Sequence, residues 1–173
     1  LDVSAARSRP GVEAVYTAAD LTSLGGLPCR AALKNARGEP AFIPHRPILA
    51  EDKVLFVGQA IAAVVAQTPE QAVDAVEAIE LSVDDLPACS DLSAALNPDT
   101  LPIHDTRTDN LCVHFEQGSA ADVDQALASG AYRISVNLVN NRVVPSPLEP
   151  RATLVEPADE GFSLYNPSQG ALG

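Results

Sequence analysis

The stretch from residue 54 to residue 88 constrains the fold more than any other part of the sequence. Residues 61–66 form a continuous apolar run with two adjacent valines, which predicts a strand buried on both faces. Thr68, Pro69 and Gln71 follow with the spacing of a helix N-terminus, in which a capping hydroxyl precedes a proline at the first helical position. A strand followed directly by a helix predicts an α+β domain.

The predicted helix is amphipathic, and its flanks predict further strands. Its expected buried stripe is Ala72, Val73, Val76 and Ile79, with Gln71, Asp74 and Glu77 left for solvent. Residues 79–83 alternate between apolar and polar side chains, which predicts a half-buried strand after the helix. Before the unit, residues 54–57 predict a strand that ends in a tight bend at Gly58.

The rest of the chain contains shorter patterns separated by turn formers. Residues 22–48 are rich in Gly, Pro and Arg and predict a long loop. Before the central unit, the patterns predict helical turns at 4–7 and 18–21 and a strand at 12–16. After it, they predict a helix over 90–96 capped by Ser90, and a helix after Ser119 with Val123, Ala126 and Leu127 buried. They also predict strands at 113–116 and 132–138, and a hairpin formed by 152–155 and 162–165.

Composition and charge exclude several classes of function. The net charge of −12 argues against nucleic acid and against an anionic membrane surface. No apolar run approaches the roughly 20 residues that a membrane-spanning helix needs. The three cysteines, Cys29, Cys89 and Cys112, are an odd number without CxxC spacing, so we expect isolated reduced thiols.

Most residues with reactive side chains have spacings that favour ordinary surface roles. The histidines lack the spacing of a metal site, and the acidic pairs fall at turns. Neither lysine lies at an exposed hairpin tip, where a lysine that carries a lipoyl or biotinyl group would be expected. These residues are His45, His104 and His114; Asp84-Asp85 and Asp159-Glu160; Lys34 and Lys53.

The segment from residue 140 to residue 152 has a different character. Three prolines stiffen it, and it presents Glu149 and Arg151 within the sequence Leu-Glu-Pro-Arg-Ala. One interpretation is a carboxylate and a guanidinium projected into a substrate channel or a domain junction. The other is a structural Glu–Arg pair that fixes one segment to its neighbour, and the residues alone favour this second interpretation.

Three blocks of sequence, in this order, resemble one known family. They are residues 2–21, residues 47–88 with FVGQAIAAVVAQTPEQAVDA, and residues 142–152 with PLEPRA. Together they resemble the large, molybdenum-binding subunit of the xanthine dehydrogenase and aldehyde oxidase family, especially its bacterial branch with separate subunits. The resemblance implies an α/β hammerhead domain at 1–100, a connector with a strand and a helix at 101–130, and the start of the molybdopterin-binding domain at 131–173.

The resemblance also implies a chemistry for the parent protein. Enzymes of this family hydroxylate an aldehyde, an N-heterocycle or a similar small substrate with water as the oxygen source. Their molybdenum–molybdopterin cofactor passes electrons to an iron–sulfur subunit and often to an FAD subunit. Glu149, Arg151 and Gln169 match family residues close to the substrate pocket or cofactor.

We therefore expect this chain to be an N-terminal fragment that lacks the catalytic base and most of the cofactor site, and so to be inactive alone. It is expected to be cytoplasmic, with a periplasmic location left open because the sequence does not begin with Met. Exposed strand edges after residue 131 are expected to promote self-association. The alternative is a non-catalytic scaffold or interaction module that uses the hammerhead fold.

Overall fold

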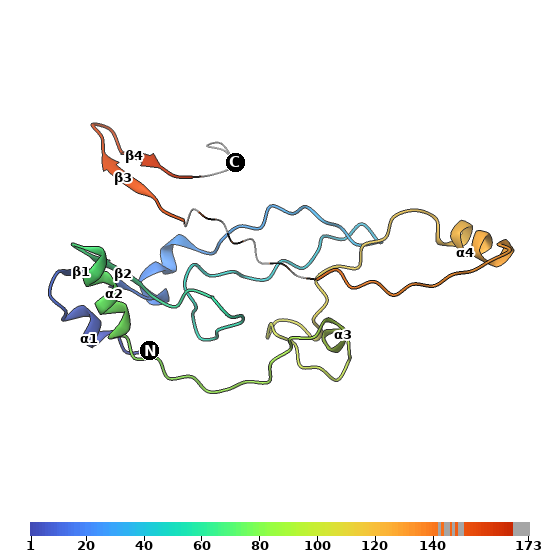
Figure 1. Ribbon diagram of the computed structural model, residues 1–173, viewed down its shortest axis with the longest axis horizontal. Coiled ribbons are helices and arrows are strands. Elements are labelled where there is room, and N and C mark those ends of the chain that lie inside the picture. The colour runs from blue at the N-terminus through green and yellow to red at the C-terminus, as the bar shows by residue number, and fades with distance from the viewer. Residues whose placement is uncertain (142, 144–145, 147, 149–150, 168–173) are drawn as a thin grey trace. The chain divides into compact units, whose positions relative to one another are not determined.

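The computed structural model describes residues 1–141, 143, 146, 148 and 151–167. The chain divides into two compact units, Leu1–Ser119 and Ala120–Gly173, which we call unit 1 and unit 2. Each unit contains both helix and strand, as Figure 1 shows, so the prediction of an α+β chain is confirmed. The predicted domain boundaries at residues 100 and 130 stay predictions.

The ordered core of unit 1 is an antiparallel strand pair with two helices beside it (Figure 1). The pairing runs from Val12 opposite Ala66 to Tyr16 opposite Ala63, with an irregularity in register between Val12 and Ala14. The elements are α1 (Ser4–Arg7), β1 (Val12–Tyr16), the 3₁₀ helix η1 (Ala18–Leu24), β2 (Ala63–Ala66) and α2 (Pro69–Glu77). Their positions confirm the predicted helical turns, the first strand and the central strand–helix unit.

The hydrophobic core of unit 1 is built mainly from small side chains. Val3, Ala6, Val15 and Ala75 form its buried cluster, and both alanines are completely buried. Alanine has no side-chain atoms beyond Cβ, so α1 and α2 approach each other and β1 closely here. The core therefore depends on close contact over a small area rather than on large side chains.

The beginning of α2 has the predicted cap. The hydroxyl oxygen of Thr68 accepts a hydrogen bond from the Gln71 amide at 3.3 Å, and Pro69 occupies the first turn. The preceding residue is also fixed, because the Gln67 amide donates to the carbonyl of Gly11 at 2.9 Å. The helix thus begins at a point where it is joined to the turn before β1.

The buried face of α2 differs from the predicted stripe. Ala75 lies at its centre, whereas Val73 and Val76 are 57% and 53% exposed. Gln71, predicted to face solvent, is half-buried. The close approach of α1 and β1 accommodates the smallest side chain, so the helix turns a face toward the core that its hydrophobicity pattern does not indicate.

The strands predicted before, within and after this unit are shorter than predicted or absent. β2 begins at Ala63 and is not buried on both faces, since Val65 is 47% exposed in a two-stranded sheet. Residues 54–57 form no strand, although the bend is present and Gly58 has a φ of 89°. Of the strand predicted at 79–83, only Glu80 pairs, through two backbone hydrogen bonds with Asp2.

Arg7 links three elements of unit 1. Its Nη2 donates to the carbonyl of Val15 in β1 at 3.1 Å and lies 3.8 Å from Oδ2 of Asp20 in η1. The same carboxylate accepts a hydrogen bond from the Thr17 amide at 2.7 Å, which closes the first turn of η1. These contacts hold the C-terminal end of β1 and the start of η1 in place.

Residues 25–48 form most of the predicted long loop, whose first three residues belong to η1. The loop contains isolated bridges between Gly26 and Pro47 and between Lys34 and Pro40. The next helix, α3 (Leu92–Ala95), is shorter than predicted, and its cap is Asp91 rather than Ser90. The predicted strand at 113–116 is absent as a strand. The carbonyl of His114 instead accepts one hydrogen bond from the long loop, as does that of Cys112 just before the predicted strand.

Unit 2 contains α4 (Ala120–Ser129) and the hairpin of β3 (Leu154–Pro157) and β4 (Phe162–Tyr165). The predicted helix after Ser119 and the predicted hairpin are confirmed, and Gly161 makes the turn with a φ of 80°. Residues 132–138 do not form the predicted strand, and the predicted stripe of α4 is exposed. Alternation defines a face, but a strand also needs a partner for its backbone groups, and the described residues supply none there.

The three cysteines are free in the structure. In the described part of the chain, every helix is too short or too polar to traverse a lipid bilayer.

We predict that replacing Gly11 by alanine destabilises unit 1 for two separable reasons. Gly11 has a φ of 78°, and an added Cβ would lie 2.2 Å from Oε1 of Gln71. Gly38 has nearly the same φ, 80°, but open space around it. Gly38→Ala should therefore lower the free energy of unfolding by about 1–2 kcal/mol from backbone strain, and Gly11→Ala by roughly 1 kcal/mol more from overpacking.

Urea unfolding of both variants measures this difference. The double variant Gly11→Ala/Gln71→Ala should lose the additional cost, because the colliding side chain is gone. Equal destabilisation by Gly11→Ala and Gly38→Ala would show that the contact between Gly11 and Gln71 is unimportant.

Candidate functional site

The described part of unit 1 contains a hollow of about 250 Å³ between loops that are distant in sequence. One wall comes from residues 42–59 and the other from residues 103–106. Its lining is mixed, with apolar, imidazole and charged side chains: Phe42, Pro44, His45, Pro47, Glu51, Asp52, Lys53, Leu55, Gln59, Ile103, His104, Asp105 and Thr106.

An ion pair joins the two walls of the hollow. Nζ of Lys53 lies 2.6 Å from both carboxylate oxygens of Asp105. The lysine side chain is 34% exposed and the aspartate side chain 72% exposed, so the pair faces solvent and stabilises only modestly. Its main effect is geometric, because it brings together residues 52 positions apart in the sequence.

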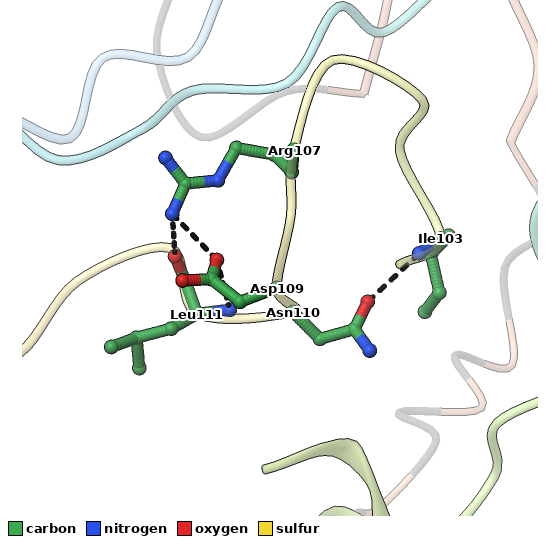
Figure 2. A network of polar contacts seen from close by, with 5 residues as sticks. All are labelled: Ile103, Arg107, Asp109, Asn110 and Leu111. Atoms are coloured by element: carbon green, nitrogen blue, oxygen red, sulfur yellow. Dashed lines mark hydrogen bonds and ion pairs between the residues drawn. The ribbon is translucent and has the colours of Figure 1, made fainter. Parts of the chain in front are cut away.

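Arg107 organises the segment 103–111, whose first four residues form this wall, as Figure 2 shows. Its Nη2 donates to Oδ1 of Asp109 at 2.6 Å and to the carbonyl of Leu111 at 3.2 Å. Asn110 closes the same turn from the other side, since its Oδ1 accepts from the Ile103 amide at 2.8 Å. One guanidinium and one amide side chain therefore hold a segment that has no helix or strand of its own.

Arg107 also contacts the opposite wall. Its guanidinium carbon lies 4.9 Å from the centre of the Phe42 ring, a cation–π contact. The imidazole of His104 meets the same ring edge-on, with centres 6.0 Å apart. Phe42 is thus held by a guanidinium and an imidazole from the other segment.

The arrangement lowers the pKa of Asp109. The hydrogen bond from Arg107 lowers the pKa of Asp109 below its ordinary value of 3.8, and the Leu111 amide contributes a smaller effect in the same direction. The carboxylate is therefore ionised at neutral pH and available to hold the guanidinium in place.

The arrangement is suited to joining segments rather than to acid–base chemistry. Lys53 is bound to Asp105, Arg107 to Asp109, and Nε2 of His45 lies 3.3 Å from Oε1 of Glu51. Among the described residues, no group of three or more His, Cys, Asp or Glu side chains could hold a metal ion.

The sequence prediction did not find this hollow. The sequence indicates Lys53 only as a candidate carrier lysine, and His45 and His104 only as surface or loop histidines. Both walls are irregular loops, so no periodic pattern marks them. The mixture of Lys, Asp and Arg in two turn-rich segments is the only signal, and it does not reveal which residues meet.

The predicted site residues are Glu149, Arg151 and Gln169. Glu149 and Gln169 fall outside the described residues, and Arg151 is exposed in unit 2, just before β3. Their predicted place beside a substrate pocket or cofactor stays a prediction. His45 and His104 line the hollow as loop residues, while His114 is exposed and lies 3.2 Å from Glu116.

Comparison with known proteins identifies the class of the chain. Residues 1–87 match the family model described as aldehyde oxidase and xanthine dehydrogenase, a/b hammerhead domain. The chain therefore belongs to the aldehyde oxidase and xanthine dehydrogenase family, and the predicted hammerhead fold is confirmed.

Particular relatives are similar along nearly the whole chain. The 6-hydroxypseudooxynicotine dehydrogenase complex subunit gamma of Paenarthrobacter nicotinovorans is 31% identical over 95% of this chain and 20% of its own length. The carbon monoxide dehydrogenase large chain of Afipia carboxidovorans is 32% identical over 86% of this chain and 19% of its own length. This chain thus spans about a fifth of the length of these relatives.

A solved structure has the same fold. Quinoline 2-oxidoreductase from Pseudomonas putida 86 matches with a TM-score of 0.79 and 27% identity, over 97% of this chain and 21% of that one. The likeness extends well beyond the hammerhead match at residues 1–87.

We predict a measurable pH dependence for the Arg107–Asp109 pair. Because the pKa of Asp109 is lowered in the folded chain, its ionised form stabilises the fold above about pH 3.8, and this contribution is lost as pH falls through the lowered value. Asp109→Asn should therefore be less stable than the parent chain at neutral pH, and the difference should shrink below pH 3.8.

Carbon NMR titration of the Asp109 carboxyl group provides the direct measurement. The midpoint should lie below 3.8 and move upward in Arg107→Ala, which removes the donor. A midpoint at or above 3.8 in the unmodified chain would contradict the hydrogen-bonded arrangement.

Proposed function

We propose that this chain is the hammerhead portion, together with the beginning of the cofactor domain, of the large subunit of a molybdenum-dependent oxidoreductase. The observation that carries the proposal is the structural likeness to quinoline 2-oxidoreductase, which covers 97% of the chain with a TM-score of 0.79. A likeness confined to the hammerhead would end near residue 87, where the family match ends.

The proposed reaction of the parent protein is hydroxylation of a carbon atom in a small substrate, such as an aldehyde or an N-heterocycle. A carbon–hydrogen bond is replaced by a carbon–hydroxyl bond, water supplies the oxygen, and two electrons and two protons are released. The proposed electron acceptors are an iron–sulfur subunit and an FAD subunit. The names of two relatives, a subunit gamma of a dehydrogenase complex and a large chain, support a parent with several subunits.

The described residues do not by themselves fit a metal centre. They contain no cluster of three or more His, Cys, Asp or Glu side chains able to hold a metal ion. We accordingly place the molybdenum–molybdopterin cofactor in the remainder of the parent protein, where it would supply the redox chemistry when bound. This chain alone is proposed to be catalytically inactive.

The proposed contribution of this chain is to shape one wall of the channel that leads the substrate to the cofactor. Glu149, Arg151 and Gln169 are the residues we assign to that wall, on the basis of their match to the family motif. The exposed apolar side chains of residues 132–139 are consistent with a segment that packs against the remainder of the parent protein. A cytoplasmic location is part of the same proposal.

The proposal predicts the sequence and metal content of the parent protein. The reading frame should continue past Gly173 into glycine-rich segments, and the purified product should contain about one molybdenum atom per large subunit, by the stoichiometry that the proposal requires. When supplied with an aldehyde or N-heterocycle, it should also reduce a dye that serves as an artificial electron acceptor. The 173-residue chain expressed alone should contain no molybdenum and reduce no dye.

Two results would contradict the proposal. A stop codon just after Gly173 would leave the non-catalytic scaffold as the better account. A full-length product that is correctly folded, yet remains free of molybdenum when expressed with cofactor synthesis intact, would also exclude the enzyme.

A further inference from the structure

Two segments of unit 1 meet through contacts of several different kinds. We call residues 33–59 the loop segment and residues 101–114 the connector segment. Lys53 of the loop segment is paired with Asp105 of the connector segment at 2.6 Å. Phe42 of the loop segment lies beneath Arg107 and against the edge of His104.

Backbone hydrogen bonds extend the same contact. The Phe42 amide donates to the carbonyl of Cys112 at 2.9 Å, and the Ala36 amide donates to the carbonyl of His114 at 3.2 Å. Neither segment contains a named helix or strand. Neither helices nor strands therefore hold the two segments against each other, and the contacts between them do so.

Each segment has local turns that preserve its shape. In the loop segment, the side chain of Asn35 accepts from the backbone amides of Arg37 and Glu39. In the connector segment, Arg107 and Asp109 close the turn described above. Local turns of this kind give two preformed surfaces that separate or meet as a whole.

The contacts between these segments are distinct from the hydrophobic core. The core cluster consists of Val3, Ala6, Val15 and Ala75, all outside both segments. The other buried apolar residues among those described, Leu49 and Ala50, belong to the loop segment and are not part of that cluster. The two sets of contacts can therefore be lost independently.

We propose that the loop segment and the connector segment form a clasp that opens and closes as one cooperative unit while the core of unit 1 stays folded. Arg107 couples its two halves, because the same guanidinium closes the turn of the connector segment and covers Phe42 of the loop segment. The hollow is lined by both segments, so it exists only while the clasp is closed.

Amide hydrogen exchange of the 173-residue chain, followed residue by residue by NMR, tests the clasp. Ala36 and Phe42 report on it, because their amides donate across the two segments. Glu80 and Ala72 report on the core, since their amides donate to Asp2 and Thr68. Arg107→Ala should accelerate exchange at Ala36 and Phe42 by a common factor of about 5- to 30-fold, with Ala72 and Glu80 changed by less than roughly twofold.

Two further variants make the result decisive. Asp105→Asn removes the ion pair at the other end of the clasp, and it should accelerate the same two amides by one common factor. Arg30→Ala removes an exposed arginine outside both segments and should leave all four amides unchanged.

Three outcomes would overturn the proposal. Acceleration of only one of Ala36 and Phe42 would show that the segments open separately. Equal acceleration at Ala72 and Glu80 would show that opening is global unfolding. Absence of protection at Ala36 and Phe42 in the unmodified chain would show that no closed clasp is populated.

Discussion

The ordered part of unit 1 depends on the close approach of α2 to α1 and β1. Ala6 and Ala75 are completely buried at this contact, and Gly11 lies directly beside the side chain of Gln71. Only six apolar residues among those described are buried, and only partly buried side chains pack around the core cluster. A core this small has no reserve of buried area with which to compensate for a lost contact.

Local signals predicted the local structure, because they act within a few residues. The Thr68 cap, the helical turn at 4–7 and the hairpin about Gly161 all follow from neighbouring side chains and are present in the structure. Predicted strands failed where a partner was needed, as at residues 132–138. The buried face of α2 was predicted only in part: Ile79 packs against the core, but Val73 and Val76 are exposed, because the hydrophobicity pattern gives no information on how closely α1 approaches.

The candidate site was less accessible to prediction than the fold. Its hollow is made by contacts such as Lys53 with Asp105 and Arg107 with Phe42, and no pattern within either loop indicates them. The family, by contrast, could be inferred from three blocks of sequence in a fixed order, and the match at residues 1–87 confirms it. The roles of Glu149, Arg151 and Gln169 derive from that resemblance and stay predictions. The described part of unit 1 thus has a small core of strands and helices, together with two loop segments joined by side-chain contacts.

The burial of Ala75 tests this account most directly. Urea unfolding of Ala75→Leu should show a loss of about 1–3 kcal/mol in the free energy of unfolding, because the larger side chain overpacks the contact with α1 and β1. Val73→Leu, on the exposed side of the same helix, should change stability by less than about 0.5 kcal/mol. If the two substitutions have equal effects, α2 does not pack through Ala75 and the account of the core is wrong.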